Sequence, residues 1–144
     1  MATKSDSRKI ALLAIQPRYA DAIFKGKKKV EFRKTRFRGD ITHVLVYVTA
    51  PVSRILGYFE VENIIEANPP KLWKMFAPVG GILKDDFLTY FSECESGMAL
   101  EIGKVASFKR PVPLGILEKI KVPPQSFCYI SPGEFRKILR RKCA

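Results

Sequence analysis

The segment of the chain with the clearest chemistry is residues 25–38, which combine many cations with one acid. Eight of these fourteen residues are lysine or arginine, and the acid is Glu31. Such cations neutralise phosphates and release counterions condensed on nucleic acid, while arginines also stack on bases or bind phosphate through a planar fork. The segment therefore predicts a surface that binds phosphate groups, with Arg36 and Arg38 as peripheral contacts.

Glu31 lies in a short stretch in which charged and apolar residues alternate. In a β-strand this alternation places Lys29, Glu31 and Arg33 on one face and directs Val30 and Phe32 into a core. Glu31 is then flanked by two cations, stays ionised and orients them. The alternative interpretation is a solvated edge strand whose charges protect it from aggregation.

The elements that position this segment are a strand and a helix that come before it. Residues 10–15 are continuously apolar, which is typical of a short strand buried on both faces. Pro17 is suited to the first turn of a helix, and Gly26 is suited to its C-terminal cap. A turn after Gly26 would then lead the chain into the charged strand.

The rest of the chain predicts a mixture of strands and short helices. Further strands are expected at residues 44–48, 54–65, 98–108 and 127–130. Helices are expected at residues 71–76, after Asp85 and Asp86 as caps, and from Ser131, where Ser131 and Glu134 form a capping box. About five or six strands without regular βαβ alternation predict an α+β fold, a mostly antiparallel sheet curled into a β-barrel with short flanking helices.

Length and charge restrict the class of protein. The 144 residues suit one domain, so we expect a disordered tail at residues 1–8 and a single domain at residues 9–144 that ends in a basic helix. The net charge is +12, and residues 1–40 carry most of the excess. This field favours a polyanionic partner, nucleic acid before an acidic membrane surface. A solvated surface kept soluble by its charge is the alternative.

Several classes of protein are disfavoured by what the sequence lacks. It has no run of about 20 apolar residues that could cross a bilayer. Three widely spaced cysteines and one histidine make no convincing zinc site, so we expect reduced thiols, no metal and no cofactor. A cytoplasmic protein is expected, or a nuclear one in a eukaryote.

The segment from Ile15 to Arg33 resembles the opening signature of the ASCH domain family, whose fold is a β-barrel related to the PUA domain. Its Gly-x-Lys and Glu-x-Arg positions are matched by Gly26, Lys28, Glu31 and Arg33. The similarity covers about residues 9–139 and continues through residues 48–52, 55–61, 99–102 and 123–129. The last of these reads Pro-Pro-Gln-Ser-Phe-Cys-Tyr, similar to a late segment of the family.

The resemblance implies a cleft beside the barrel that binds RNA or a nucleotide-like ligand. Lys28 is out of phase with the face of Glu31 and Arg33, but the turn after Gly26 can redirect it. The residues implied at the cleft are Gly26, Lys28, Glu31 and Arg33 at its centre and Gln125, Ser126 and Tyr129 from the late segment.

Relatives with enzymatic activity leave a second interpretation open. Some are amidohydrolases that act on acylated cytidine with a Lys, a Thr and a Glu; Lys28 matches the first, but Glu31 stands at the Thr position and cannot serve as that nucleophile. Others are ribonucleases, for which Glu31 could act as base and Lys28 or Arg33 could stabilise the phosphorane. A protein-interaction module, as in coactivator-associated relatives, is a third interpretation.

We therefore expect a monomeric RNA-binding or nucleotide-binding domain that serves RNA metabolism or the regulation of translation or transcription. Its partner would be RNA or single-stranded nucleic acid, and whether the cleft is catalytic is left open. His43 is expected to be structural, and Trp73 and Phe76 to belong to the core. The C-terminal helix, with Arg136 and Arg140 among its cations, could extend the RNA footprint or touch an acidic membrane.

Overall fold

Six β-strands form one sheet in the computed structural model, which describes residues 6–37, 40–120 and 122–142. The strands are β1 (Ile10–Ile15), β2 (Val30–Arg33), β3 (His43–Val48), β4 (Arg54–Ala67), β5 (Gly97–Val112) and β6 (Phe127–Ile130). The helices are α1 (Pro17–Phe24), α2 (Pro69–Phe76), α3 (Lys84–Tyr90) and α4 (Pro132–Lys142), with short 3-10 turns η1 (Ala77–Val79) and η2 (Leu114–Ile116). The predicted α+β class is confirmed.

The sheet is mostly antiparallel, as predicted, but it is not a closed barrel. Its strand order is β2-β5-β4-β3-β1-β6, and β1 and β3 form its one parallel pair among the described residues. β2 and β6 are the two edges, and each has four residues. No backbone pairing joins these edges in the described part of the chain, so the expectation of a barrel holds only as far as a curled, open sheet.

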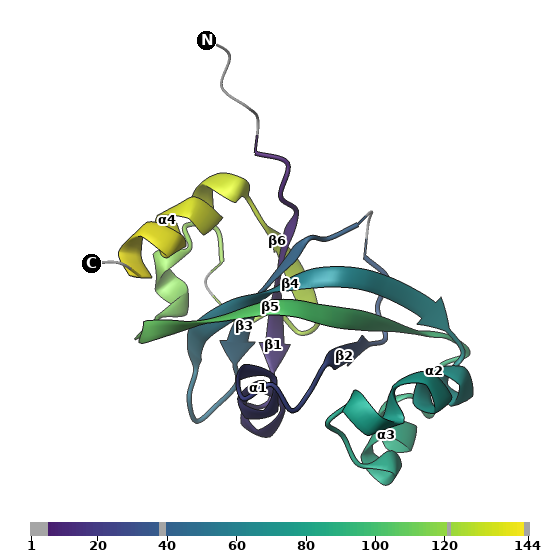
Figure 1. Cartoon of the computed structure of the whole chain (residues 1–144). Coiled ribbons are helices and arrows are strands. Elements are labelled where there is room, and N and C mark those ends of the chain that lie inside the picture. The colour runs from purple at the N-terminus through teal and green to yellow at the C-terminus, as the bar shows by residue number, and fades with distance from the viewer. Residues whose placement is uncertain (1–5, 38–39, 121, 143–144) are drawn as a thin grey trace.

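Helices cover both faces of this sheet and lie at both ends of its long strands. Leu12 and Leu13 are neighbours in β1 and both fully buried, but they belong to different apolar clusters because successive strand side chains point to opposite faces. The cluster of Leu13 packs against α1, and that of Leu12 against α4. Figure 1 shows α4 at one end of the long strands β4 and β5, and α2 and α3 at the other.

A third cluster fixes β2 to the helices at its end of the sheet. Val30 and Phe32 point into it, together with side chains of α2 and α3. The rings of Phe32 and Phe87 meet edge to face, with centroids 4.9 Å apart. The predicted inward direction of Val30 and Phe32 is confirmed, and with Phe76 in this cluster its predicted core role is confirmed too.

Helix ends agree with the sequence in part. Pro17 begins α1, and Gly26 follows its end with φ of +76°, a conformation that favours glycine. Asp85 and Asp86 do not cap α3: they lie in its first turn, where carboxylates still complement the helix dipole. At α4 half of the capping box forms, since the Glu134 backbone N–H donates to Ser131, while the Glu134 carboxylate accepts from the backbone of Glu118.

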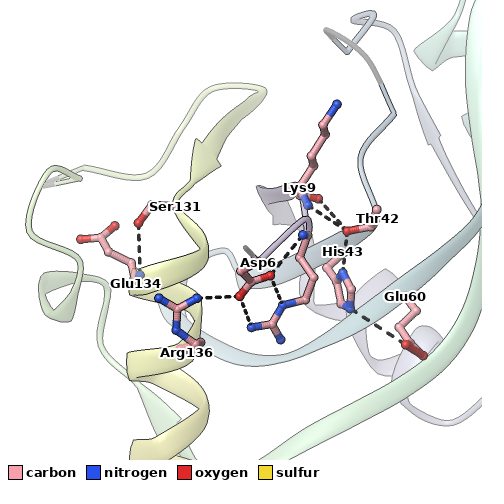
Figure 2. A network of polar contacts seen from close by, with 9 residues as sticks. Asp6, Lys9, Thr42, His43, Glu60, Ser131, Glu134 and Arg136 are labelled. Carbon is pink, nitrogen blue, oxygen red and sulfur yellow. Dashed lines mark hydrogen bonds and ion pairs between the residues drawn. The ribbon is translucent and has the colours of Figure 1, made fainter. Parts of the chain in front are cut away.

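A polar network joins the start of the chain to α4 and to the start of β3 (Figure 2). Asp6 accepts hydrogen bonds from the Arg8 side chain and from Arg136 at 2.7 Å. His43 contacts the Thr42 hydroxyl at 2.7 Å and lies 3.9 Å from the Glu60 carboxylate. Burial lowers the pKa of His43, and these contacts support the structural role expected for it. The disordered tail stays a prediction, and its residues 1–5 lie outside the described residues.

None of the described helices has both the length and the apolar character needed to cross a bilayer.

Asp6→Asn tests whether this network stabilises the fold. Hydrogen bonds from the Arg8 guanidinium hold the pKa of Asp6 far below its usual range, so the contribution of the carboxylate is present above its unfolded pKa of about 3.9 and is lost as the pH falls. We expect the substitution to lower the melting temperature near neutral pH, and the difference from wild type to shrink below about pH 4. Thermal melting followed by circular dichroism measures both.

The matched control is Asp21→Asn, since Asp21 pairs with Lys25 on an exposed face of α1. Exposed pairs of this kind contribute about 0.3–0.5 kcal/mol, so little change is expected. A loss at Asp6 that is the same at neutral and acid pH would show that the carboxylate charge does not matter.

Candidate functional site

A pocket of about 330 Å³ lies where the two edges of the sheet approach each other. Its wall comes from the end of β1, the first turn of α1, β2 and the residues after it, α3, and the segment just before β6. Five residues singled out in the sequence line it: Lys28, Glu31, Arg33, Gln125 and Ser126. Residues 31 and 126 are thus brought together by the folding of the sheet.

Three charged side chains form the floor of this pocket. Lys28 is 3% exposed and Glu31 is 6% exposed. The Lys28 ammonium lies 3.8 Å from one carboxylate oxygen of Glu31, and an Arg33 guanidinium nitrogen lies 3.4 Å from the other. A single buried carboxylate therefore lies between two cations, at distances longer than those of tight ion pairs.

The position of Lys28 depends on two turns that contain glycine, the first at Gly26 and the second at Gly80–Gly81. After Gly26 the backbone N–H of Lys28 still bonds to the carbonyl of Ala22, which turns the lysine away from the alternation of β2. Its ammonium then donates to the carbonyl of Gly80. Burial lowers the pKa of Lys28, and the nearby carboxylate of Glu31 opposes part of this shift.

Arg33 spans the opening between the two sheet edges. Its guanidinium donates to the backbone carbonyl of Ser126 at 2.7 Å and lies 3.5 Å from the carbonyl of Ala14 in β1. The Nε of Arg33 is buried and has no partner among the described residues. The Arg33 fork thus links β1, β2 and the segment before β6, three of the segments that line the pocket.

Aromatic side chains supply the apolar part of the wall. Tyr19 and Tyr90 both line the pocket, and burial raises the pKa of each, so both hydroxyls stay protonated at neutral pH. The Lys28 ammonium lies 5.3 Å from the ring centroids of Tyr19 and Phe32, within cation–π range. The pocket thus combines flat apolar surfaces with a charged floor.

Other predicted residues lie away from the pocket. Arg36 has a side chain 77% exposed and pairs with Glu66 at 2.9 Å. Tyr129 is 44% exposed and lines a separate shallow hollow with Arg8 and Lys9. Gly26 shapes the turn before Lys28 but does not line the pocket, and Arg38 lies outside the described residues.

Sequence reasoning missed several lining residues. Gln16 and Tyr19 belong to the segment that carried the family resemblance, so that segment was a signal for them. Tyr90 lies in α3 and Ile82 in the loop before it, and no sequence pattern near either residue pointed to the pocket. Within the described ranges no cluster of His, Cys, Asp and Glu could hold a metal ion.

The fold of the chain has counterparts among known proteins. Residues 13–109 match the family model of the ASCH domain, so the chain belongs to the ASCH domain family. It is 28% identical over 141 residues to an ASCH domain-containing ribonuclease of Zymomonas mobilis, with 95% of each chain covered. The crystal structure of the ASCH protein from Zymomonas mobilis superposes with a TM-score of 0.84 at 27% identity, covering 93% of this chain and 96% of that one.

A more distant likeness concerns the fold alone. The YTH domain of the MRB1 protein from Zygosaccharomyces rouxii, solved in complex with N6-methyladenosine RNA, has a TM-score of 0.55 at 12% identity and covers 100% of this chain and 90% of that one. The match to the ASCH family model confirms the resemblance that residues 15–33 indicate.

Gly81→Ala tests whether the second glycine turn holds Lys28 in place. Gly81 has φ of +61°, and a Cβ there would lie 2.7 Å from the Cβ of Lys28. The left-handed conformation alone costs a non-glycine residue about 1–2 kcal/mol, and the contact adds to it. We expect Gly81→Ala to lower the free energy of unfolding by about 2 kcal/mol or more in urea titrations.

The matched control is Gly115→Ala, because no atom lies within 4 Å of a Cβ at Gly115 and its φ is not positive. Its effect should stay within about 0.5 kcal/mol. Equal effects of the two substitutions would mean that the contact between Gly81 and Lys28 is unimportant.

Proposed function

We propose that this protein binds single-stranded RNA and holds one nucleotide in the pocket of Lys28, Glu31 and Arg33. The observation that carries the proposal is the burial of Lys28 and Glu31 around one pocket, with the Arg33 side chain, 11% exposed, beside them. Buried charges are costly to maintain, and such groups cluster at functional sites. The ribonuclease name of the Zymomonas mobilis relative supports RNA as the ligand.

The size of the pocket supports a single nucleotide rather than a double helix. About 330 Å³ lies at the small end of ligand pockets, and flat aromatic side chains line it. Proteins that recognise single-stranded RNA splay bases out and stack them on such side chains. A duplex would keep its bases paired and out of reach of Glu31.

Cations beside the pocket would contact neighbouring phosphates. A second hollow, lined by Arg18 and Lys27, shares Tyr19 and Ile82 with the pocket. Lys34 lines the pocket itself and lies 4.6 Å from the ring centroid of Tyr90. With a net charge of +12, the chain has a long-range attraction for a polyanion as well as these local contacts.

Arg33→Lys and Arg36→Lys test the proposal as a matched pair. Both keep the charge, but only Arg33→Lys removes a fork that lines the pocket and joins β2 to the backbone of Ser126. We expect Arg33→Lys to weaken binding of a fluorescently labelled single-stranded RNA about tenfold and Arg36→Lys to change it less than about twofold. Fluorescence anisotropy at several salt concentrations measures the affinity and its salt slope. Indistinguishable variants would place the RNA outside the pocket.

A second candidate function is RNA cleavage in the same pocket. The nearly full-length similarity to the Zymomonas mobilis ribonuclease favours it, and so does the buried cation beside a carboxylate. In this reaction a base removes the proton of a 2′-hydroxyl, and its oxygen attacks the adjacent phosphorus to form a cyclic phosphate. The 5′-oxygen leaves as a hydroxyl after it takes a proton from water. Glu31 could serve as the base, and Lys28 or Arg33 could stabilise charge on the phosphorane.

Lys28→Met and Lys29→Met test this second function. Each removes one positive charge, but Lys28 is buried in the pocket while Lys29 is exposed and outside its wall. If the protein cleaves RNA, Lys28→Met should reduce the rate about a hundredfold or more, and Lys29→Met should leave it nearly unchanged. Gel analysis of end-labelled RNA follows the products. An equal loss in both variants would mean that only general charge matters.

A further inference from the structure

We propose that the pocket selects guanine, with Lys28 and Glu31 reading its Watson–Crick edge. This inference rests on the proposed function, since it concerns which nucleotide of a single-stranded RNA the pocket holds. It follows from the hydrogen-bonding capacity that the buried charged groups leave unused.

Glu31 has more acceptor capacity than the described residues use. An ionised carboxylate can accept about four hydrogen bonds. Among the described residues Glu31 accepts one, from Arg33 at 3.4 Å, which is long for a charged pair. Lys28 stays 3.8 Å from the other oxygen. A carboxylate that is 6% exposed and has so few partners is expected to accept hydrogen bonds from a ligand in the pocket it lines.

Lys28 supplies a donor beside these acceptors. Its ammonium has three N–H groups, and one of them donates to the carbonyl of Gly80. The remaining donors lie next to the Glu31 carboxylate, at the floor of the same pocket. Side by side, Lys28 and Glu31 offer a ligand one donor followed by two acceptors.

Guanine is the standard base whose edge complements this order. Its Watson–Crick edge has the acceptor O6 followed by two donors, N1–H and the N2 amino group. Uracil has one donor between two acceptors, and cytosine and adenine place an acceptor next to a single amino donor. Each of these would leave an oxygen of Glu31 unpaired or face it with another acceptor, which is costly in a buried site.

A phosphate group fits the floor less well than a base edge. Phosphate has only acceptors to offer, and its charge would meet the buried carboxylate of Glu31. The walls of Ile15, Tyr19, Ile82 and Tyr90 suit the flat faces of a purine. Phosphates are better accommodated by the cations beside the pocket, such as Lys34 and Lys27.

The test uses short RNAs that differ in one central base. The probes are labelled pentaribonucleotides with two uridines on each side of guanosine, inosine, adenosine or uridine, and anisotropy measures their affinity for the wild-type protein. We expect guanosine to bind about tenfold or more tightly than adenosine or uridine, with inosine between, because it lacks the N2 donor. This comparison needs no variant, so it does not depend on how a substitution folds.

A matched pair of variants then assigns the preference to Glu31. Glu31→Gln replaces one acceptor oxygen with a donor of nearly the same size, and it should bring the guanosine-to-adenosine ratio close to one. The control Glu66→Gln removes a carboxylate that pairs with Arg36 outside the pocket, and it should keep the ratio. Thermal melting shows whether both variants fold.

The outcomes separate this inference from the proposed function. If no pentamer or longer single-stranded RNA binds, the proposed function itself is wrong. If the RNAs bind and respond to Arg33→Lys but show no preference for guanosine, only the guanine inference is overturned. If Glu31→Gln abolishes RNA cleavage and keeps a guanosine preference, Glu31 acts as a base for the reaction and does not read the nucleobase.

Discussion

The arrangement depends on the placement of a buried carboxylate between a buried lysine and a largely buried arginine at the edge of a sheet. Removing such charges from water costs several kcal/mol for each ion, and attraction between them offsets the cost only in suitable geometry. Here the nitrogens of Arg33 and Lys28 lie 3.4 and 3.8 Å from the Glu31 oxygens, which is longer than in tight ion pairs. Backbone carbonyls are additional partners of the cations, Gly80 for Lys28 and Ser126 for Arg33.

The charged group lies where the sheet is open, between the edge strands β2 and β6. Pairing of β2 with β6 would satisfy their edge backbone groups and fill the space that the pocket occupies. Instead a guanidinium spans the opening, with bonds to Glu31 and to the backbone on the far side. A side-chain bridge leaves room for a ligand between the edges, which backbone pairing would not. Arg33 therefore stabilises the fold and forms the site with the same atoms.

Much of the fold and part of the site follow from local sequence patterns. The alternation in residues 29–33 predicts that Val30 and Phe32 point inward, and the structure agrees. The same alternation places Glu31 beside Arg33. It does not predict that Glu31 lines a pocket, because α3 and the segment before β6 complete that pocket and are distant in the sequence.

The remaining parts of the site depend on contacts that no local pattern encodes. The pair Gly80–Gly81 reads as an interruption between helices, yet its carbonyl and its lack of a side chain hold Lys28. Tyr90 lies on a helix whose pattern indicates only packing. Arg36, expected only as a peripheral contact, lies outside the pocket, and Tyr129, which the resemblance implied at the cleft, lines a separate hollow. Charge and aromaticity indicate what a residue can bind, and only the folded chain decides what it faces.

The presence of Glu31 in a cationic site bears on what that site is for. A negative charge weakens the attraction for any polyanion, so a surface adapted only to affinity would not contain one. The 26 lysines and arginines already supply general attraction, and the exposed ones can do so without any particular geometry. A buried carboxylate, by contrast, penalises every ligand that cannot donate to it. In the proposed function, its role is therefore discrimination among ligands more than strength of binding.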